Sequence, residues 1–306
     1  MRARRCARSI TALIVVSLLL SSTSPLEAQG KQKRFASVED ATTSLVDALR
    51  SNDRQALVAI LGPEGSALVS SGDAVADRIG RERFLAEYDQ AHHVEGGGGK
   101  VTLYVGQDDF PLPIPLVPDR DVWRFDTKAG KEEILNRRIG QNELSAIQTC
   151  LAYVDAQREY YAEDRNADGL REYAQRFAST SGKRDGLYWE AKAGEPPSPL
   201  GPLVVSARGE GYRRGEKPTP YHGYFYRILT AQGSAAPGGR YDYLAHGRMI
   251  GGFALVAFPA QYGVSGVMTF IVNHDGVVYQ KDLGPDTPAL ASGMKAFNPD
   301  DTWKKV

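Results

Sequence analysis

Residues 136–163 read NRRIGQNELSAIQTCLAYVDAQREYYAE and form the longest stretch of the chain with one helical pattern. Apolar side chains recur there at every third, fourth or seventh position, the spacing that places them on one face of an α-helix. The polar residues between them fall on the opposite face. The spacing therefore predicts one long helix that buries a stripe made of Leu144, Ile147, Leu151, Val154 and Tyr161.

The segments after this helix alternate between turn residues and short β-rich runs. Beyond a proline-rich loop, the composition predicts four strands, over residues 223–230, 252–258, 267–272 and 277–282. Asp275-Gly276 lies between the last two and is a strong hairpin signal. Residues 136–306 are therefore expected to form a domain in which the long helix packs on an antiparallel β-meander.

The chain before the long helix carries three shorter helical patterns followed by strand-like runs. The helices are predicted to start near Phe35, Asp53 and Asp73, with Ser37 as the first N-cap. Gly96 to Gly99 marks a hinge or turn, and strands are expected over 101–106, 112–117 and 122–126. Residues 35–135 are thus predicted to form a domain of helices plus a small antiparallel sheet, and the whole chain belongs to the α+β class.

The first 28 residues have the three-part layout of a secretory signal peptide. Four arginines precede an apolar run from Ile10 to Leu20, and small residues lead to a cleavage point after Ala28. A run of eleven residues is too short to cross a hydrocarbon core about 30 Å thick. The sequence therefore predicts a periplasmic or secreted protein, a short disordered leader over 29–34, and no transmembrane segment in the mature chain.

The charge balance argues against nucleic acid as a partner. Lysine plus arginine and aspartate plus glutamate both number 37, and loss of residues 1–28 leaves 33 basic and 36 acidic groups. Such a chain lacks the global positive field that attracts a phosphate backbone. Its 42% apolar and 24% charged residues are typical of a packed globular protein.

One loop resembles the first half of a calcium-binding loop. In DRNADGLRE, residues 164–172, oxygen-bearing side chains alternate and a glycine follows, as in the D-x-[DN]-x-[DN]-G pattern. Gln175 stands where the complete loop needs a bidentate glutamate, so a site here is expected to be weak. The alternative is a turn that ends the helix with solvated carboxylates. The candidate ligands are Asp164, Asn166, Asp168, Leu170 through its carbonyl, and Glu172.

A second cluster suggests a ligand site without metal. Arg184, Tyr188 and Trp189 lie in the glycine-containing segment KRDGLYW, where aromatic rings can stack on a sugar or grip a peptide. The alternative is that the two rings anchor a long loop to the core.

The sequence offers no catalytic constellation that we can assign. The five histidines are scattered, and Ser265 lacks the G-x-S-x-G spacing of a nucleophile elbow. After removal of Cys6 with the signal, Cys150 is the one remaining thiol, and its apolar neighbours predict a buried core position. We therefore assign no catalytic residue and favour a protein that is not an enzyme.

Two parts of the chain resemble known folds. The opening FASVEDATTSLVDALRSND, the following RQALVAILGPEG and the later VWRFDTKAG resemble the nuclear-transport-factor-two-like (cystatin-like) cone fold, which implies a cone-shaped pocket in residues 35–135. The runs HGYFYRILT, GGFALVAFP and GVMTFIVNHDGVVY resemble the globular head of type IV pilins. Since the chain carries an ordinary cleavable signal and a whole domain in front, the resemblance implies a shared fold and not polymerisation.

Nearly the whole chain also resembles the bacterial secreted family known as domain of unknown function 2950. The stretches that carry this resemblance include FASVEDA, AILGPEG, WRFDTKAGKEEILNRRIGQNEL, EYAQRFASTSGKRDGLYW, PPSPLGPL and GRMIGGFALVAFPAQYGVSGVMTF. It implies an exported bacterial protein and no particular activity.

These observations favour an exported, non-catalytic binding or envelope-associated protein whose partner is an envelope protein or a glycan. Two alternatives stay open. One is an extracytoplasmic hydrolase that acts on cell-wall or other polymers, and the other is a structural module stabilised by calcium.

Overall fold

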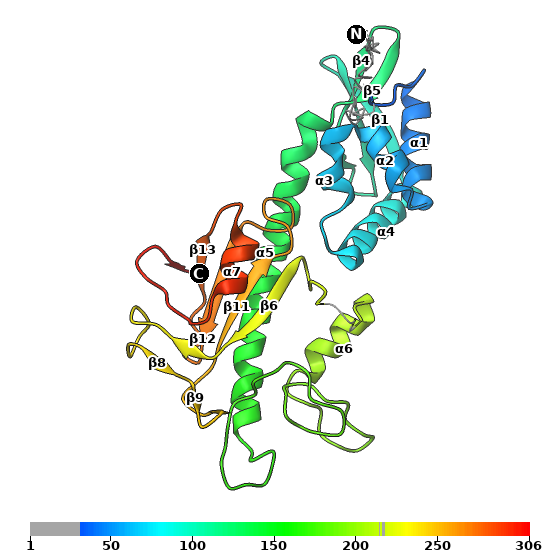
Figure 1. Ribbon diagram of the computed structural model, residues 1–306. Coiled ribbons are helices and arrows are strands. Elements are labelled where there is room, and N and C mark those ends of the chain that lie inside the picture. Colours follow the sequence, from blue (N-terminus) through cyan, green and yellow to red (C-terminus); the bar gives the residue numbers. More distant parts are fainter. Residues whose placement is uncertain (1–30, 214, 216–217) are drawn as a thin grey trace, which may run out of the picture. The chain divides into compact units, whose positions relative to one another are not determined.

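The computed structural model describes residues 31–213, 215 and 218–306. Figure 1 shows helices and antiparallel sheets that are segregated along the chain, so the predicted α+β class is confirmed. The expected signal peptide lies outside the described residues. Within the described residues, no helix is long and apolar enough to cross a membrane.

Helices form the first part of the fold, and side-chain caps set where they begin. The elements are α1 (Val38–Arg50), α2 (Arg54–Leu61), the 3-10 turn η1 (Pro63–Gly65), α3 (Ser66–Val69) and α4 (Ala74–Gln90). Ser37 Oγ accepts from the amide of Asp40 at 2.9 Å, which confirms the predicted N-cap. Asp53 caps α2 in the same way, and Gly62-Pro63 ends it.

The segment after α4 and the segment before α1 both differ from the prediction. The third of the predicted helices, α4, ends at Gln90, and the strand β1 (His92–Gly97) follows it directly. The sequence predicted only a glycine turn in this region. Gln32, in the segment expected to be a disordered leader, donates from Nε2 to the carbonyls of Ile60 and Phe125, at 3.0 and 2.8 Å. These two bonds tie the leader to the first core.

The first sheet is antiparallel and small. Its strands are β1, β2 (Lys100–Val105), β3 (Phe110–Pro111), β4 (Leu116–Asp119) and β5 (Val122–Phe125). They run in the order β1-β2-β4-β5, with β3 paired to β2. Gly98 and Gly99 form the β1–β2 turn with φ of 61° and 77°, a left-handed geometry that favours glycine. Against the helices this sheet encloses a core that includes Phe35, Leu45, Leu57, Ile60, Leu116 and Phe125.

The long helix α5 (Thr127–Tyr161) contains 35 residues and starts nine residues before the predicted point. The sequence-based domain boundary between residues 135 and 136 therefore falls inside it. Its first turns contact η1 and α3, and its later turns contact the second sheet. Gly130 permits the early start, because a Cβ there would lie 2.7 Å from the amide nitrogen of Ile114 and closer still to the Pro113 carbonyl.

The buried face of α5 matches the predicted stripe only in part, since Val154 is buried and Ile147 packs against the second core. Leu144 and Leu151 are 65% and 43% exposed, so their assignment to a buried stripe was wrong. The face that packs is built from smaller and amphipathic side chains at spacings of three and four: Ala146, Cys150, Tyr153, Gln157 and Tyr160. Tyrosine bodies fill the space that leucine was expected to fill.

The second sheet lies against the later turns of α5. Its main strands are β6 (Tyr224–Leu229), β11 (Ala254–Pro259), β12 (Met268–Asn273), β13 (Tyr279–Asp282) and β14 (Lys304–Lys305). All neighbours are antiparallel, in the order β14-β13-β12-β11-β6, which confirms the predicted meander of β6, β11, β12 and β13, with β14 added at one edge. The register and hydrogen bonds place α7 (Thr287–Gly293) over the opposite face from α5, since the Arg227 side chain donates to the Ala291 carbonyl at 2.7 Å.

Several smaller elements complete this part. They are α6 (Gly201–Glu210), which sequence analysis did not foresee, and the short strands β7 (Ala231–Gln232), β8 (Tyr241–Asp242), β9 (Leu244–Ala245) and β10 (Arg248–Met249). The second core that results is the larger of the two and includes Tyr153, Tyr224, Tyr243, Phe253, Phe270 and Phe297.

Candidate functional site

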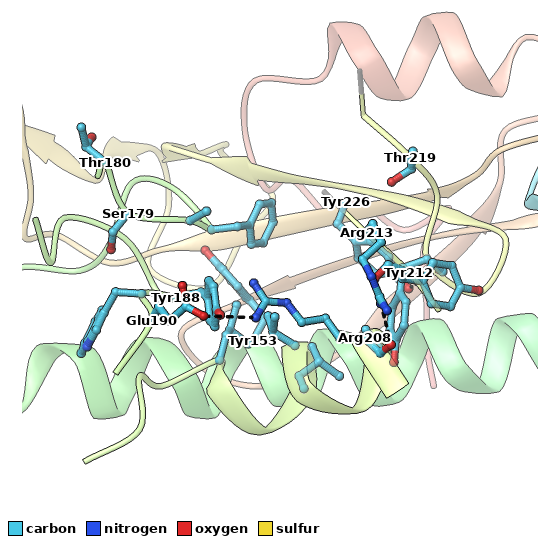
Figure 2. Close-up of a pocket in the computed structure, with 18 of the residues that line it drawn as sticks. Tyr153, Ser179, Thr180, Tyr188, Glu190, Arg208, Tyr212, Arg213, Thr219 and Tyr226 are labelled. Carbon is cyan, nitrogen blue, oxygen red and sulfur yellow. Dashed lines mark hydrogen bonds and ion pairs between the residues drawn. The ribbon is translucent and has the colours of Figure 1, made fainter. Parts of the chain in front are cut away.

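A cavity of about 910 Å³ opens between α5 and β6 on one side and α6 and a long loop, residues 177–195, on the other. We call it the aromatic pocket (Figure 2). Thr149 and Tyr153 of α5, Tyr226 of β6 and Leu255 of β11 line one side of it. This volume falls in the range of clefts that hold small-molecule or peptide ligands.

Tyrosine hydroxyls and aromatic faces dominate the lining. The aromatic residues that reach the cavity are Tyr153, Phe177, Tyr188, Trp189, Tyr212, Tyr221, Phe225 and Tyr226. Burial raises the pKa of Tyr221 to about 12 and raises the pKa values of Tyr153, Tyr212 and Tyr226 further above the ordinary range. These phenols stay neutral at physiological pH and do not act as phenolate nucleophiles. The hydroxyls of Tyr153, Tyr212 and Tyr226 already donate to Ala254, Asp73 and Tyr221, so these three can accept from a ligand but cannot donate to it without breaking those bonds.

The charged side chains at the cavity are mainly cationic. Among the described lining residues, five are basic (Lys183, Arg184, Lys192, Arg208 and Arg213) and two are acidic (Glu190 and Glu195). Arg184 pairs with Glu195 at 3.1 Å, and Arg208 lies 3.9 Å from Glu190, the latter pair drawn in Figure 2. Neither Lys183 nor Lys192 forms an ion pair with a described carboxylate. The excess of positive charge favours anionic ligands.

The three ligand candidates found in the sequence all line the pocket. Arg184, Tyr188 and Trp189 lie on the 177–195 loop, with Arg184 Cζ at 5.4 Å from the centre of the Trp189 ring. Arg165 Cζ lies over the same ring at 5.3 Å, and the buried Trp189 Nε1 has no hydrogen-bond partner among the described residues. The indole is thus held by cation–π contacts.

The loop holds Tyr188 through backbone pairing. The amide of Tyr188 donates to the Phe177 carbonyl at 2.7 Å, and the amide of Ser179 donates to the Tyr188 carbonyl at 2.8 Å. Gly186 makes this close pairing feasible, because a Cβ there would lie 2.7 Å from the carbonyl carbon of Ala178. Arg208 of α6 lies over the Tyr188 ring at 5.3 Å. The loop and α6 are therefore joined at the pocket.

A buried aspartate positions the other end of the pocket. Asp73 caps α4 by accepting from the amides of Val75 and Ala76 through Oδ1, at 3.1 and 3.0 Å. Its Oδ2 accepts from the Tyr212 hydroxyl and the Gly223 amide, both at 2.9 Å. Tyr212 lines the cavity, so the α4 cap fixes one pocket wall. This link has no local sequence signal, because Tyr212 and Gly223 stand 139 and 150 residues from Asp73.

The residues of the predicted calcium loop lie close together in the chain, but an arginine pairs with two of their three carboxylates. Asp164 accepts from the amides of Asn166 and Gly169, at 3.3 and 2.7 Å, which is the turn named as the alternative. Arg248 pairs with Asp168 and, at 3.2 Å, with Glu172. The hydrogen bond from Arg248 holds the pKa of Asp168 below its ordinary value. Across residues 31–213, 215 and 218–306, no three His, Cys, Asp or Glu residues are grouped in a way that could hold a metal ion.

Calcium would have to displace Arg248 before it could bind this loop. We therefore expect millimolar Ca²⁺ to leave the melting temperature of the wild-type chain unchanged and to raise that of Arg248→Gln, in which both carboxylates lose their cation. Differential scanning fluorimetry with and without Ca²⁺ checks this expectation. A rise in the wild type that disappears in Asp164→Ala plus Asp168→Ala would instead support the calcium-stabilised alternative.

Cys150 is fully buried in the second core, as the sequence predicted. Desolvation raises the pKa of its thiol to about 12, so almost none of it is the reactive thiolate at neutral pH. We expect a Cys6→Ser chain to react with a thiol reagent such as 5,5′-dithiobis(2-nitrobenzoate) only as fast as it unfolds. Stoichiometric labelling of the folded chain within minutes would contradict this placement.

A family model described as protein of unknown function (DUF2950) matches residues 32–306. No curated protein and no solved structure matches the chain. The resemblances to the cone fold and to the pilin head therefore stay predictions.

Proposed function

We propose that this protein, which belongs to the DUF2950 family, is an exported binding protein whose ligand lies in the aromatic pocket. The observation that carries the proposal is the lining itself: eight aromatic side chains and five cations converge on one cavity of about 910 Å³. The ligand is a component of the bacterial envelope, either a protein segment or a glycan.

The lining supports binding better than catalysis. Burial raises the pKa of its tyrosines and so keeps their phenols neutral, and its two described carboxylates each lie beside an arginine. Aromatic rings and neutral hydroxyls supply apolar contact and hydrogen bonds, which fix a ligand without moving a proton. The hydrolase alternative would need an acid and a base that face each other across the substrate, and the two described glutamates of this cavity each lie beside an arginine instead.

The predicted export rests on the sequence of residues 1–28, whose arginines, apolar run and Leu26-Glu27-Ala28 ending match a cleavable signal. The buried single thiol of the mature chain suits an oxidising compartment, since it can form no exposed disulfide. Within this proposal, residues 35–135 serve as the cone-like domain and residues 136–306 as the pilin-head-like domain. The pocket belongs to the second of these, apart from the brace that Asp73 provides.

Charge reversal at the pocket tests the proposal. The wild-type chain is immobilised and challenged with a solubilised envelope fraction, and the retained material is compared with that on Lys192→Glu plus Arg208→Glu. We expect the double variant to retain at least about tenfold less, because like charges then face an anionic ligand. Arg240→Glu is the matched control, since Arg240 is exposed and lies outside the pocket lining.

Circular dichroism and melting temperature establish that each variant is folded. Equal retention by the wild type and the folded double variant would rule out the pocket as the ligand site. Turnover of a cell-wall polymer by the wild type, abolished by Glu190→Gln or Glu195→Gln, would favour the hydrolase alternative.

A further inference from the structure

We infer that the ligand of the aromatic pocket is an extended peptide segment with acidic side chains, which adds as a strand to the outer edge of β6. The inference rests on the proposed function and narrows it from two classes of ligand to one. Three observations carry it: the unpaired edge of β6, the side chains that flank this edge, and the charge of the lining.

The first observation is that β6 ends the second sheet. It pairs with β11 on one side, and in the part of the chain that the structure describes no strand pairs with its other side between Phe225 and Leu229. The amide of Ala260 donates to the Gly223 carbonyl at 2.8 Å, which fixes the hydrogen-bonded register of the two strands. Antiparallel hydrogen-bonded pairs alternate. Residues 225, 227 and 229 therefore bond to β11, and the backbone groups of Tyr226 and Ile228 point outward.

The outward groups are available to a partner. None of the hydrogen bonds among the described residues uses the amide or carbonyl of Tyr226 or Ile228. Tyr224, at the start of the strand, is already engaged in a bridge with Tyr221. An added strand would thus find two donors and two acceptors at Tyr226 and Ile228, the pattern that peptide-binding sheet edges use.

The second observation is that side chains from both faces of β6 reach the cavity. Tyr226 projects toward α5 together with Leu255, and Phe225 projects from the opposite face, because successive residues of a strand alternate. Both can line one pocket only because the pocket lies along the strand edge. On the far side, α6 presents Leu203 and Val204 to the same cavity. An extended chain between them would place alternate side chains on the two aromatic surfaces.

The third observation is the surplus of cations, which a neutral glycan would not need. Lys183 and Lys192 form no ion pair with a described carboxylate, while the two glutamates at the cavity already face arginines. A peptide with aspartate or glutamate beside an apolar or aromatic residue complements both features. We expect peptides selected for binding to this protein to have this composition.

Selection of linear peptides from a random display library on the full chain, at two salt concentrations, tests the inference. We expect acidic-apolar sequences whose binding weakens with salt. Synthetic copies of the best peptide are then N-methylated at one residue at a time. Strand addition predicts that methylation at every second position weakens binding by about tenfold, because only those amides face β6, while the other positions tolerate the methyl group.

The protein side has a matched pair of variants. Ile228→Pro removes the outward amide of an edge residue without touching the ladder to β11, and Ile228→Ala removes the side chain alone. We expect the proline variant to bind the selected peptide about tenfold more weakly than the alanine variant. The N-methyl scan decides the question if Ile228→Pro fails to fold.

Failure of this inference is distinguishable from failure of the proposed function. A glycan that binds the wild type and not Lys192→Glu plus Arg208→Glu, with no peptide selected, would overturn strand addition and leave the pocket as the site. Selected peptides that show no alternation on N-methylation, or that bind the pocket variant equally well, would also overturn it.

Discussion

Replacing Asp73 with alanine is expected to lower the free energy of unfolding by about 4 kcal/mol. The Asp73 side chain is 1% exposed and accepts four hydrogen bonds, two from the first turn of α4 and two from Tyr212 and Gly223. Alanine removes an N-cap, which costs about 1 kcal/mol, and leaves a buried hydroxyl and a buried amide without an acceptor, at about 1–3 kcal/mol each. Urea denaturation followed by circular dichroism measures the loss.

Two milder variants separate these contributions. Asp73→Asn keeps the shape and one good acceptor, so we expect it to lose less than half of what alanine loses. Tyr212→Phe removes only the hydroxyl and is expected to lower the free energy of unfolding by about 1 kcal/mol. An Asp73→Ala chain as stable as the wild type would show that α4 and the segment before β6 are not joined as described.

Replacing Gly130 with alanine is expected to destabilise the chain by about 2–3 kcal/mol, although alanine is the better helix former by about 1 kcal/mol. A Cβ at residue 130 would overlap the Pro113 carbonyl and lie 2.7 Å from the amide nitrogen of Ile114. Both are backbone atoms that no side-chain rotation can move away, so α5 itself would have to shift from the first sheet.

Gly140→Ala is the matched control, because it lies in the same helix and a Cβ there meets no atom within 4 Å. We expect this variant to be more stable than the wild type by about 0.5–1 kcal/mol. The pair gives changes of opposite sign in one helix, read from the same thermal or urea unfolding curves. Equal effects at the two positions would show that the first turns of α5 do not approach the segment at Pro113 closely.

Local sequence signals predicted where several of the helices and main strands begin and end. Ser37 and Asp53 cap their helices through side-chain oxygens that need only residues two or three positions further on, and Gly62-Pro63 stops α2 for equally local reasons. The β-rich runs 223–230 and 252–258, bounded by turn residues, correspond to β6 and β11. Such signals involve a few neighbouring residues, so they can be read without the fold.

The start of α5 and the choice of its buried face depend on long-range packing, so local sequence signals did not predict them. Gly130 and Gly140 weaken the helical pattern, so the start of α5 at Thr127 was missed. Residue 130 is a glycine because the helix approaches the Pro113 backbone too closely for a Cβ. Leu144 and Leu151 are the more apolar residues, but the core selects Tyr153 and Gln157, because Gln157 bonds Ala174 in both directions and to the Tyr153 hydroxyl.

In the candidate site too, residues that are neighbours in sequence could be predicted and contacts between distant segments could not. Arg184, Tyr188 and Trp189 were found because they are neighbours in sequence, and the structure places all three at the cavity. The contribution of Tyr226 and the brace from Asp73 to Tyr212 could not be found, because they come from segments far apart in the chain. For the predicted calcium loop, the oxygen-bearing side chains are neighbours in sequence, whereas Arg248, which pairs with Asp168, is 80 residues away and could not be found from the loop.

Site-specific photocrosslinking in living cells tests the ligand-binding pocket most directly. A photoreactive p-benzoylphenylalanine replaces Lys192 at the pocket, and a second chain carries it at Arg240, which is exposed and outside the lining. We predict a discrete adduct with an envelope component at position 192 only, which mass spectrometry identifies and which Arg208→Glu diminishes. The same adducts at both positions, or none at position 192 while the chain is folded and exported, would contradict the account.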